Sequence, residues 1–162
     1  MIHIVGKDIL TDDQRKKLIE DVQPLFVSGD QFDPNPDSFF PGKQTFPTLH
    51  LHPDFQWVFD IFKDRIRKKL GFDLKVMGAW INWTNGNKKD ICWHDHHHFD
   101  YASVYYIKTP LPFFSNGTLF RDGLVKSPQN SFLLFPGHLE HTAPSSPFRF
   151  GRYTMSIDWD NK

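Results

Sequence analysis

The chain has 162 residues, and its 19 Lys and Arg residues balance its 19 Asp and Glu residues. This length suits one domain with a hydrophobic core. We therefore expect a single domain over residues 1–162, with helical support at about 8–70 and a β-rich core at about 75–160. The balanced charge gives no field that would hold nucleic acid or an anionic membrane surface, so neither is an expected partner. The composition indicates no oligomeric state.

The cysteine content and the apolar pattern bear on the compartment. Cys92 is the single cysteine, so no intrachain disulfide can form, which favours a reducing compartment. The segment 1–8 lacks the basic start and apolar run of a signal peptide, and no segment approaches the ~20 apolar residues of a membrane span. We therefore expect a soluble, cytoplasmic protein.

The first half of the chain predicts two helices. Thr11 to Gln14 has the form of a capping box, and apolar residues then recur at helical spacing, which predicts a helix from Asp12 to Gln23. A second helix is expected from Asp54 to Leu70, with Gly71 as its C-terminal stop. Between them, the Pro- and Gly-rich segment 29–47 predicts a long loop.

The second half predicts short β-strands that are rich in aromatic and β-branched residues and are separated by Pro, Gly and Asn. Helices followed by strands favour an α+β fold, in which the helices cover an antiparallel sandwich or barrel. The expected strands are Val76–Trp83, Asp90–His96, Tyr101–Lys108, Thr118–Phe120, Ser131–Phe135 and Phe150–Trp159.

A histidine cluster indicates a metal site. Four of the five residues from His94 to His98 are histidines, and His141 follows the next apolar strand. Residues two apart on a strand face the same way, so His94 and His96, or His96 and His98, can point to one ion, with His141 as the third ligand. Three ligands leave up to three positions open, as in non-haem Fe(II) oxygenases that hold a co-substrate and O2 together. Structural zinc would need four ligands, usually with cysteines.

Arg152 begins the last expected strand. A guanidinium at the base of a pocket can bind a carboxylate through two parallel hydrogen bonds. Beside the histidines, such an arginine would suit a dicarboxylate co-substrate.

Several motifs between residues 44 and 158 carry a family resemblance. They are Ala79-Trp80-Ile81-Asn82-Trp83 with Gly86, His94-Asp95-His96, Tyr101-Ala102-Ser103-Val104-Tyr105-Tyr106-Ile107, Asn116-Gly117-Thr118-Leu119-Phe120, Leu134-Phe135-Pro136 to His141, and Arg152-Tyr153-Thr154-Met155-Ser156. In these motifs the chain resembles the 2-oxoglutarate/Fe(II)-dependent dioxygenases, and among them the prolyl 4-hydroxylase-like branch found in bacteria and marine phages. The resemblance implies a double-stranded β-helix, or jelly-roll, with helices packed outside. It also implies the host cytoplasm if the gene belongs to a phage.

The resemblance also implies roles for single residues. His94 matches the first iron ligand and His141 the distal one. Arg152 matches the residue that binds the far carboxylate of 2-oxoglutarate, and Tyr106 matches a hydroxyl donor to the same carboxylate.

One position departs from the family pattern. The usual carboxylate ligand, two residues after the first histidine, is His96 here, so the motif reads H-x-H. Three neutral imidazoles would leave the charge of Fe(II) without an offset. A second register restores H-x-D with His98 and Asp100. We favour His94 and His96, because Asp100 leaves little chain before the strand that carries Tyr106.

Other residues near these motifs are candidates for the co-substrate and substrate contacts. Thr154 and Ser156 should face inward beside Arg152 and could contact the co-substrate. The segment Lys43–Thr45 resembles one that closes over the site in this family. Candidate substrate-cleft residues are Trp83, Trp93, Phe99 and Tyr101. Asp95, His97 and His98 are expected at the mouth of the site or behind the ligands, and His138 and Glu140 beside the distal histidine; a position in solvent is the alternative for these five.

The activity that the resemblance implies is hydroxylation of an unactivated C–H bond, with O2 and 2-oxoglutarate consumed and succinate and CO2 released. A prolyl residue of a peptide or protein is the expected substrate, and a small molecule stays open. Two alternatives remain, a cupin-like metal-binding jelly-roll without 2-oxoglutarate chemistry and a non-catalytic interaction module.

Overall fold

A computed structural model of the chain describes residues 1–28, 42–85, 92–109, 116–144 and 151–162. Its helices are α1 (Asp12–Val22) and α2 (Gln56–Leu70), with short 3-10 turns η1 (Gln23–Leu25), η3 (Leu49–Leu51) and η4 (Pro53–Phe55). Its strands are β1 (His3–Lys7), β2 (Val27–Ser28), β3 (Lys43–Gln44), β4 (Leu74–Thr84), β5 (Tyr101–Lys108), β6 (Asn116–Phe120), β7 (Gly123–Ser127), β8 (Ser131–Pro136), β9 (His141–Thr142) and β10 (Arg152–Asn161).

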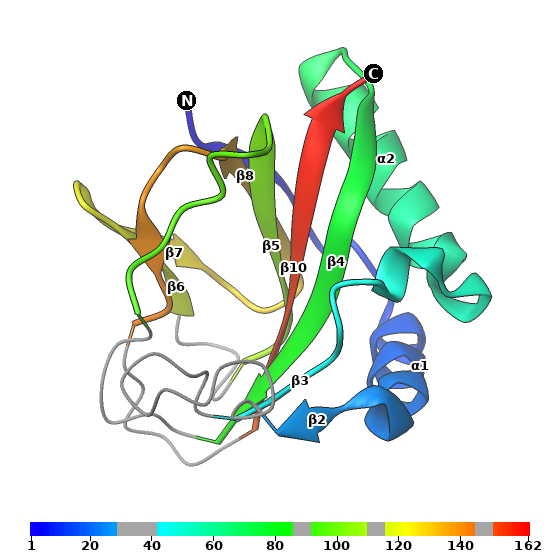
Figure 1. Ribbon diagram of the computed structural model, residues 1–162. Helices are drawn as coiled ribbons and strands as arrows, with labels where there is room; N and C mark the ends of the chain where they lie inside the picture. The colour runs from blue at the N-terminus through cyan, green and yellow to red at the C-terminus, as the bar shows by residue number, and fades with distance from the viewer. Residues whose placement is uncertain (29–41, 86–91, 110–115, 145–150) are drawn as a thin grey trace.

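The strands form two antiparallel sheets. The main sheet has the order β1-β8-β5-β10-β4-β3-β2, and the small sheet has the order β7-β6-β9. Figure 1 shows the helices on one side of the main sheet and the small sheet on the other. The expectation of a mostly β structure with a large antiparallel sheet covered by helices is confirmed.

Both expected helices are present, and local chemistry explains their ends. The Thr11 hydroxyl accepts a hydrogen bond from the Gln14 amide, and the Gln14 side chain accepts one from the Thr11 amide, which completes the capping box at the start of α1. Helix α2 ends at Gly71, whose φ of 79° lies in the left-handed region that glycine adopts readily. No helix in the described part of the chain is long and apolar enough to cross a membrane.

The expected strand Asp90–His96 is wrong in its described part. Residues 92–96 make only one isolated bridge, between His94 and His141. The His96 amide then donates to the Gly137 carbonyl at 2.7 Å, and the Phe99 amide donates to the His96 carbonyl at 2.9 Å, so the backbone turns instead of extending. Isolated backbone contacts, of His94 with His141 and of His96 with Gly137, therefore replace the continuous hydrogen-bond ladder of a strand.

The remaining differences lie at short or edge elements. Strands β1 and β7 were not expected from the sequence, because few of their side chains are buried and the alternation is weak. In the expected loop 29–47, residues 29–41 lie outside the described residues, and Lys43–Gln44 form β3 at the sheet edge. In the expected strand Phe150–Trp159, Phe150 lies outside the described residues, and β10 begins at Arg152 after Gly151.

Strand alternation divides the side chains of the main sheet between two faces. In β5, Tyr105 and Ile107 pack in the core under the helices, whereas Ala102 and Tyr106 pack in the core between the two sheets. Strand β10 follows the same rule. Met155, Ile157 and Trp159 face the helices. The alternate residues Arg152, Thr154, Ser156 and Asp158 face the opposite side of the sheet.

Asn130 joins the N-terminal segment to this framework. Its side-chain oxygen accepts hydrogen bonds from the Leu10 amide at 3.0 Å and the Tyr105 hydroxyl at 2.6 Å, and its side-chain amide donates to the Leu10 carbonyl at 2.7 Å. The residue is buried and has a φ of 63°, which asparagine tolerates better than most residues.

Replacing Asn130 with alanine should lower the free energy of unfolding by about 3 kcal/mol, because buried partners would lose their hydrogen bonds together. Tyr105→Phe removes one hydroxyl from the same network and should cost only about 1 kcal/mol. Urea denaturation of the two variants measures both values. Equal losses would show that Asn130 does not organise the network.

Candidate metal and anion site

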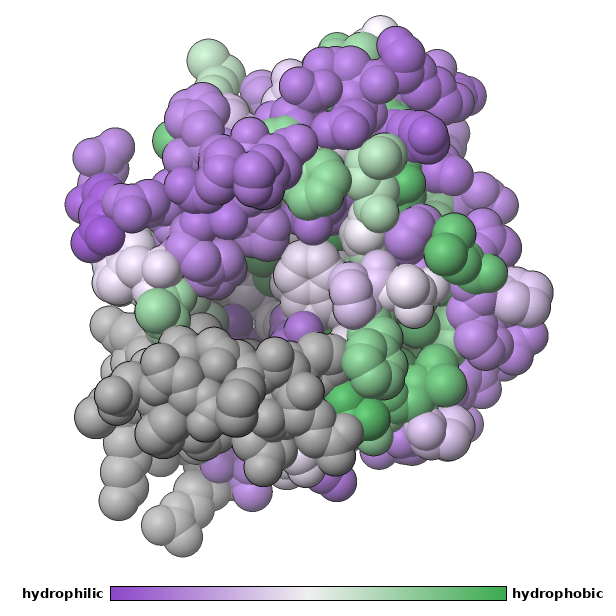
Figure 2. All heavy atoms as spheres, viewed as in Figure 1, coloured by the Kyte–Doolittle hydropathy of each residue, from purple (hydrophilic) through white to green (hydrophobic). Residues whose placement is uncertain are grey.

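A cavity of about 390 Å³ lies on the face of the main sheet that is turned toward the small sheet. Figure 2 shows the surface hollowed left of centre, between the central strands and the small sheet. Its floor consists of side chains in register on neighbouring strands, namely the pair Thr84–Arg152, the pair Asn82–Thr154 and the row Trp80–Ser156–Val104.

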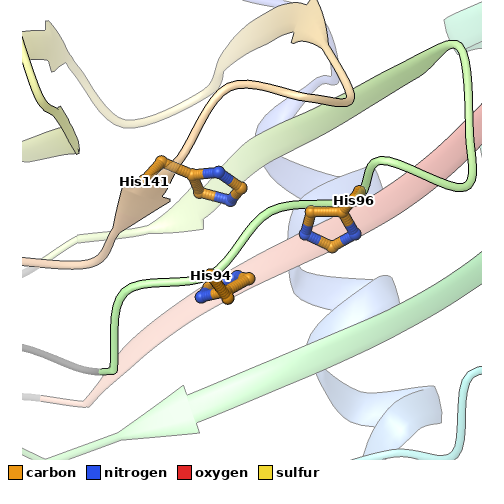
Figure 3. A group of neighbouring side chains, drawn as sticks. All are labelled: His94, His96 and His141. Atoms are coloured by element: carbon orange, nitrogen blue, oxygen red, sulfur yellow. The ribbon is translucent and has the colours of Figure 1, made fainter.

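Three histidines converge at this cavity (Figure 3). His94 and His96 come from the turn before β5, and His141 begins β9 of the small sheet. Their ligand nitrogens all lie within 4.8 Å of one another. Two backbone hydrogen bonds between His94 and His141, of 3.1 Å and 2.9 Å, hold the two chain segments together. The site therefore forms where the two sheets meet.

The Nδ1 atoms of the three rings all face acceptors. Nδ1 of His94 is 2.9 Å from the Cys92 carbonyl, and Nδ1 of His141 is 2.9 Å from the Leu139 carbonyl. Nδ1 of His96 lies 2.7 Å from Oδ1 of Asp158. Because an acceptor on one ring nitrogen fixes the proton there, Nε2 of each ring keeps its lone pair for a metal.

The electrostatics favour neutral rings. Burial, and next the positive charge of a protonated His94, lowers the pKa of His141 to about 3. Desolvation lowers the pKa of His94 too, although part of this residue is exposed. Near neutral pH both imidazoles are therefore unprotonated, which is the form that binds metal.

Arg152 supplies a positive charge to the same cavity. The residue is only 7% exposed, and desolvation lowers the pKa of its guanidinium. It forms no ion pair with any carboxylate in the described part of the chain. Its guanidinium lies 5.9 Å from the centre of the Tyr106 ring. A buried cation without an ionic partner is costly, so the arrangement suits an anionic ligand.

Hydroxyl groups line the same cavity as this guanidinium. Thr154 and Ser156 line the cavity, as their alternation with Met155 requires. Tyr106 is fully buried, and its hydroxyl is hydrogen-bonded to the hydroxyl of Thr118, which lines the cavity. Thr118 therefore lies between Tyr106 and the cavity.

Asp100 lies away from the three histidines. Its Oδ2 accepts hydrogen bonds from the backbone amide and the side-chain amide of Asn161, at 2.9 Å and 2.8 Å. Its own amide donates to Asp160 at 3.1 Å. Asp100 thus fastens the end of β10, and it is not part of the group of converging ligands, which among the described residues contains His94, His96 and His141.

The aromatic residues suggested for a substrate cleft are placed elsewhere. Trp83 contacts Lys43, Trp93 contacts Arg121, and Tyr101 stacks on Phe72 on the helix side. None of these three aromatics, nor Phe99, lines the cavity. Within the segment Lys43–Thr45, Gln44 lines the cavity, whereas the Thr45 hydroxyl accepts a hydrogen bond from the Ile81 amide at 3.0 Å.

The other residues near the histidine motif have surface contacts. His97 pairs with Asp95, and the rings of His97 and His98 lie 3.9 Å apart. His138 is exposed. Glu140 forms an ion pair with Arg121 at 2.8 Å.

Sequence reasoning gave no role to several residues of the site, among them Trp80, Asn82, Thr118 and Asp158. The first three belong to recognised motifs, and strand alternation from Ile81 would have placed Trp80 and Asn82 on the face opposite the core. The place of Thr118 in the site could not be predicted, because it depends on how the small sheet packs over the main sheet. Asp158 could have been found from its parity with Arg152, because both lie on the same face of β10.

The two possible ligand registers predict different variants. His96→Ala should weaken the binding of Co(II) or Fe(II) by about 100-fold or more, since one ligand contributes roughly 3 kcal/mol to a site of this kind. Asp100→Asn should leave metal affinity within about two-fold, because Asp100 contacts Asn161 instead. Anaerobic titration followed by absorption spectroscopy measures both. The opposite ranking would make Asp100 the ligand.

No protein-family model and no curated protein matches this chain. Its fold is similar to several solved structures. SnoN, a non-heme alpha-ketoglutarate-dependent epimerase from nogalamycin biosynthesis, is 8% identical with a TM-score of 0.71, over 96% of this chain and 76% of SnoN. The viral collagen prolyl hydroxylase vCPH from Paramecium Bursaria Chlorella virus-1, in its 2OG complex, is 11% identical with a TM-score of 0.67, over 98% of this chain and 94% of vCPH. HygX from Streptomyces hygroscopicus, with nickel and 2-oxoglutarate bound, is 10% identical with a TM-score of 0.65, over 99% of this chain and 83% of HygX. At these identities, the likeness establishes a shared fold.

Proposed function

We propose that this protein is a 2-oxoglutarate- and Fe(II)-dependent dioxygenase that hydroxylates an unactivated C–H bond. The observation that carries the proposal is the presence, in one cavity, of three converging histidines and a buried arginine that has no ionic partner among the described residues. The first group suits a divalent metal and the second suits a carboxylate. A ligand that bridges them must have a metal-chelating end and an anionic end, as 2-oxoglutarate has.

The residues fit the metal. His94, His96 and His141 can each offer Nε2, because an acceptor lies against each Nδ1. These three histidines would hold Fe(II) and would leave room on the ion for the chelating end of a 2-oxo acid and for O2. When bound, Fe(II) with 2-oxoglutarate supplies an oxidative decarboxylation that releases succinate and CO2 and transfers one oxygen atom to the substrate.

The remaining residues would bind and orient the co-substrate. Arg152 would hold the far carboxylate through its planar guanidinium, and Thr154 would add a hydroxyl from the same strand face. Thr118 presents its hydroxyl to the cavity, and Tyr106 supports it from behind. On this proposal, Tyr106 contacts the carboxylate directly only if the Thr118 hydrogen bond opens. The Ser156 hydroxyl accepts a hydrogen bond from the Asn82 side-chain amide at 3.2 Å, and this pair keeps the floor of the site polar.

The fold similarity supports the same conclusion. The names of the similar structures mention alpha-ketoglutarate dependence, a 2OG complex, and bound nickel with 2-oxoglutarate. We infer that the two facing sheets belong to a double-stranded β-helix formed by a single domain. Neither a cupin-like metal protein nor a non-catalytic module requires a buried arginine that lacks an ionic partner among the described residues, so Arg152 favours the oxygenase.

Arg152→Ala should weaken 2-oxoglutarate binding about 100-fold, on the order of 3 kcal/mol, because two charge-assisted hydrogen bonds would be lost. Metal affinity should stay unchanged, since Arg152 contacts no histidine of the site. Anaerobic titration of the Fe(II) protein with 2-oxoglutarate, followed through its visible absorption, gives the dissociation constants. Arg67→Ala, which removes an exposed arginine of α2, is the matched control.

A second ligand sharpens this test. The five-carbon acid 2-oxopentanoate keeps the chelating end of 2-oxoglutarate and lacks the far carboxylate. It should bind the unaltered protein weakly, and Arg152→Ala should not weaken it further. If both ligands lose affinity equally in the variant, Arg152 does not bind the far carboxylate.

We further propose a prolyl residue of a peptide or protein as the substrate, supported by the fold similarity to a collagen prolyl hydroxylase. A proline-containing peptide should raise succinate release above the rate without peptide and should gain the mass of one oxygen atom. The same peptide with alanine in place of proline should do neither, and His141→Ala should abolish both signals. Inversion of a stereocentre without a gain in mass would instead favour epimerisation, the reaction for which SnoN is described.

A further inference from the structure

We infer that Asp158 is a positioning residue for the metal, which holds His96 by its Nδ1 and places a negative charge behind that ligand. The inference deepens the proposed function, because it rests on the proposed metal site, but it does not depend on the identity of the co-substrate. The carboxylate that the H-x-H motif lacks is thereby supplied from the sheet, one imidazole away from the ion.

The first support is the placement of Asp158. It lies on the cavity side of β10, on the same face as Arg152, and it is 6% exposed. Its neighbours in register are Ala102 on β5 and Gly78 on β4. A Cβ atom at Gly78 would come within 3.4 Å of Oδ2 of Asp158. The two smallest residue types therefore flank the carboxylate, and they leave room above it for an imidazole ring.

The second support is the contact itself. Oδ1 of Asp158 lies 2.7 Å from Nδ1 of His96, which is an ion-pair distance. The contact does not have the alignment of a hydrogen bond, and this buried Oδ1 has no hydrogen-bond partner among the described residues. A histidine that binds a metal through Nε2 directs its Nδ1–H away from the ion. Asp158 is the acceptor on that side of His96.

The third support is charge. Among the described residues, no lysine or arginine pairs with Asp158, and its ion-pair contact is with His96. A buried carboxylate without a lysine or arginine partner is poorly compensated. A divalent ion bound to the other nitrogen of the same ring supplies the missing positive charge. The carboxylate would in turn make His96 a more basic ligand.

Two aromatic rings restrain the remaining freedom of His96. The Trp80 ring is stacked with it, with centroids 5.9 Å apart and an interplanar angle of 22°. The His141 ring is also stacked with it, at 5.2 Å and 17°. These contacts limit the tilt of the imidazole, whereas Asp158 determines which nitrogen carries the proton. Orientation and tautomer are thus set by different neighbours.

The test is Asp158→Asn, which keeps the shape of the side chain and removes its charge. The dissociation constant of Co(II), measured by its visible absorption without any 2-oxo acid, should rise about 10- to 100-fold. The control is Asp160→Asn, which removes the same charge two residues further along the strand. The Asp160 carboxylate accepts a hydrogen bond from the Asp100 amide, so this variant should leave Co(II) affinity unchanged.

Thermal unfolding separates this role from a purely structural one. Without metal, the Asp158→Asn variant should unfold at the same temperature as the unaltered protein or a higher one, because a buried charge is removed. The rise in unfolding temperature on addition of Co(II) should be smaller in the variant. A loss of stability without metal, combined with an unchanged Co(II) dissociation constant, would overturn the inference.

The remaining outcomes are equally decisive. If Asp158→Asn does not fold, Asp158→Ser replaces it, and failure of both to fold would show a structural role and overturn the inference. If the unaltered protein does not bind Co(II), this inference and the proposed function fall together. If Co(II) binding depends on Asp158 but 2-oxoglutarate does not bind, the proposed function fails and the inference stands.

Discussion

The two-sided alternation of strand β10 is the constraint on which the site depends. One face of β10 is buried under the helices through Met155, Ile157 and Trp159. The residues at the alternate positions of the strand must therefore face the small sheet. A shift of one residue in register would bury the charged set under the helices and expose the apolar one. The apolar core therefore fixes Arg152 and Asp158 on the side of β10 that faces the small sheet as firmly as it fixes the fold.

Arg152 and Asp158 have opposite charges on one strand face, yet they cannot neutralise each other. Six residues of extended chain separate them by about 20 Å. At that distance, with an effective dielectric constant near 20, their attraction is about 0.8 kcal/mol, whereas the burial of each ion costs several kcal/mol. Each charge therefore needs its own partner. On the proposed function, the co-substrate carboxylate would be the partner of Arg152, and a metal ion bound to His96 would be the partner of Asp158.

Local signals in the sequence were enough for much of this architecture. The capping box of Thr11, the stop at Gly71 and the alternation of β5 and β10 are encoded by neighbouring residues, and the helices and long strands were predicted from them. The turn at His96 was missed, because it is fixed by the Gly137 carbonyl, which belongs to a distant part of the chain. The histidine set was proposed from spacing and a family resemblance. Its contact with Asp158 could not be, because it depends on which strand lies beneath the turn.

On the proposed function, His96 takes the position of the aspartate ligand of an H-x-D site, which would change the location of negative charge more than its amount. In an H-x-D site the carboxylate would touch the ion and offset its charge directly. With Asp158 behind His96, the carboxylate would polarise the ligand and would leave a bound ion more positive toward a further ligand. A more positive ion would bind an anionic chelator more strongly. The weaker neutralisation of the metal by the protein would therefore strengthen the attraction for a dicarboxylate, whose far end Arg152 would receive.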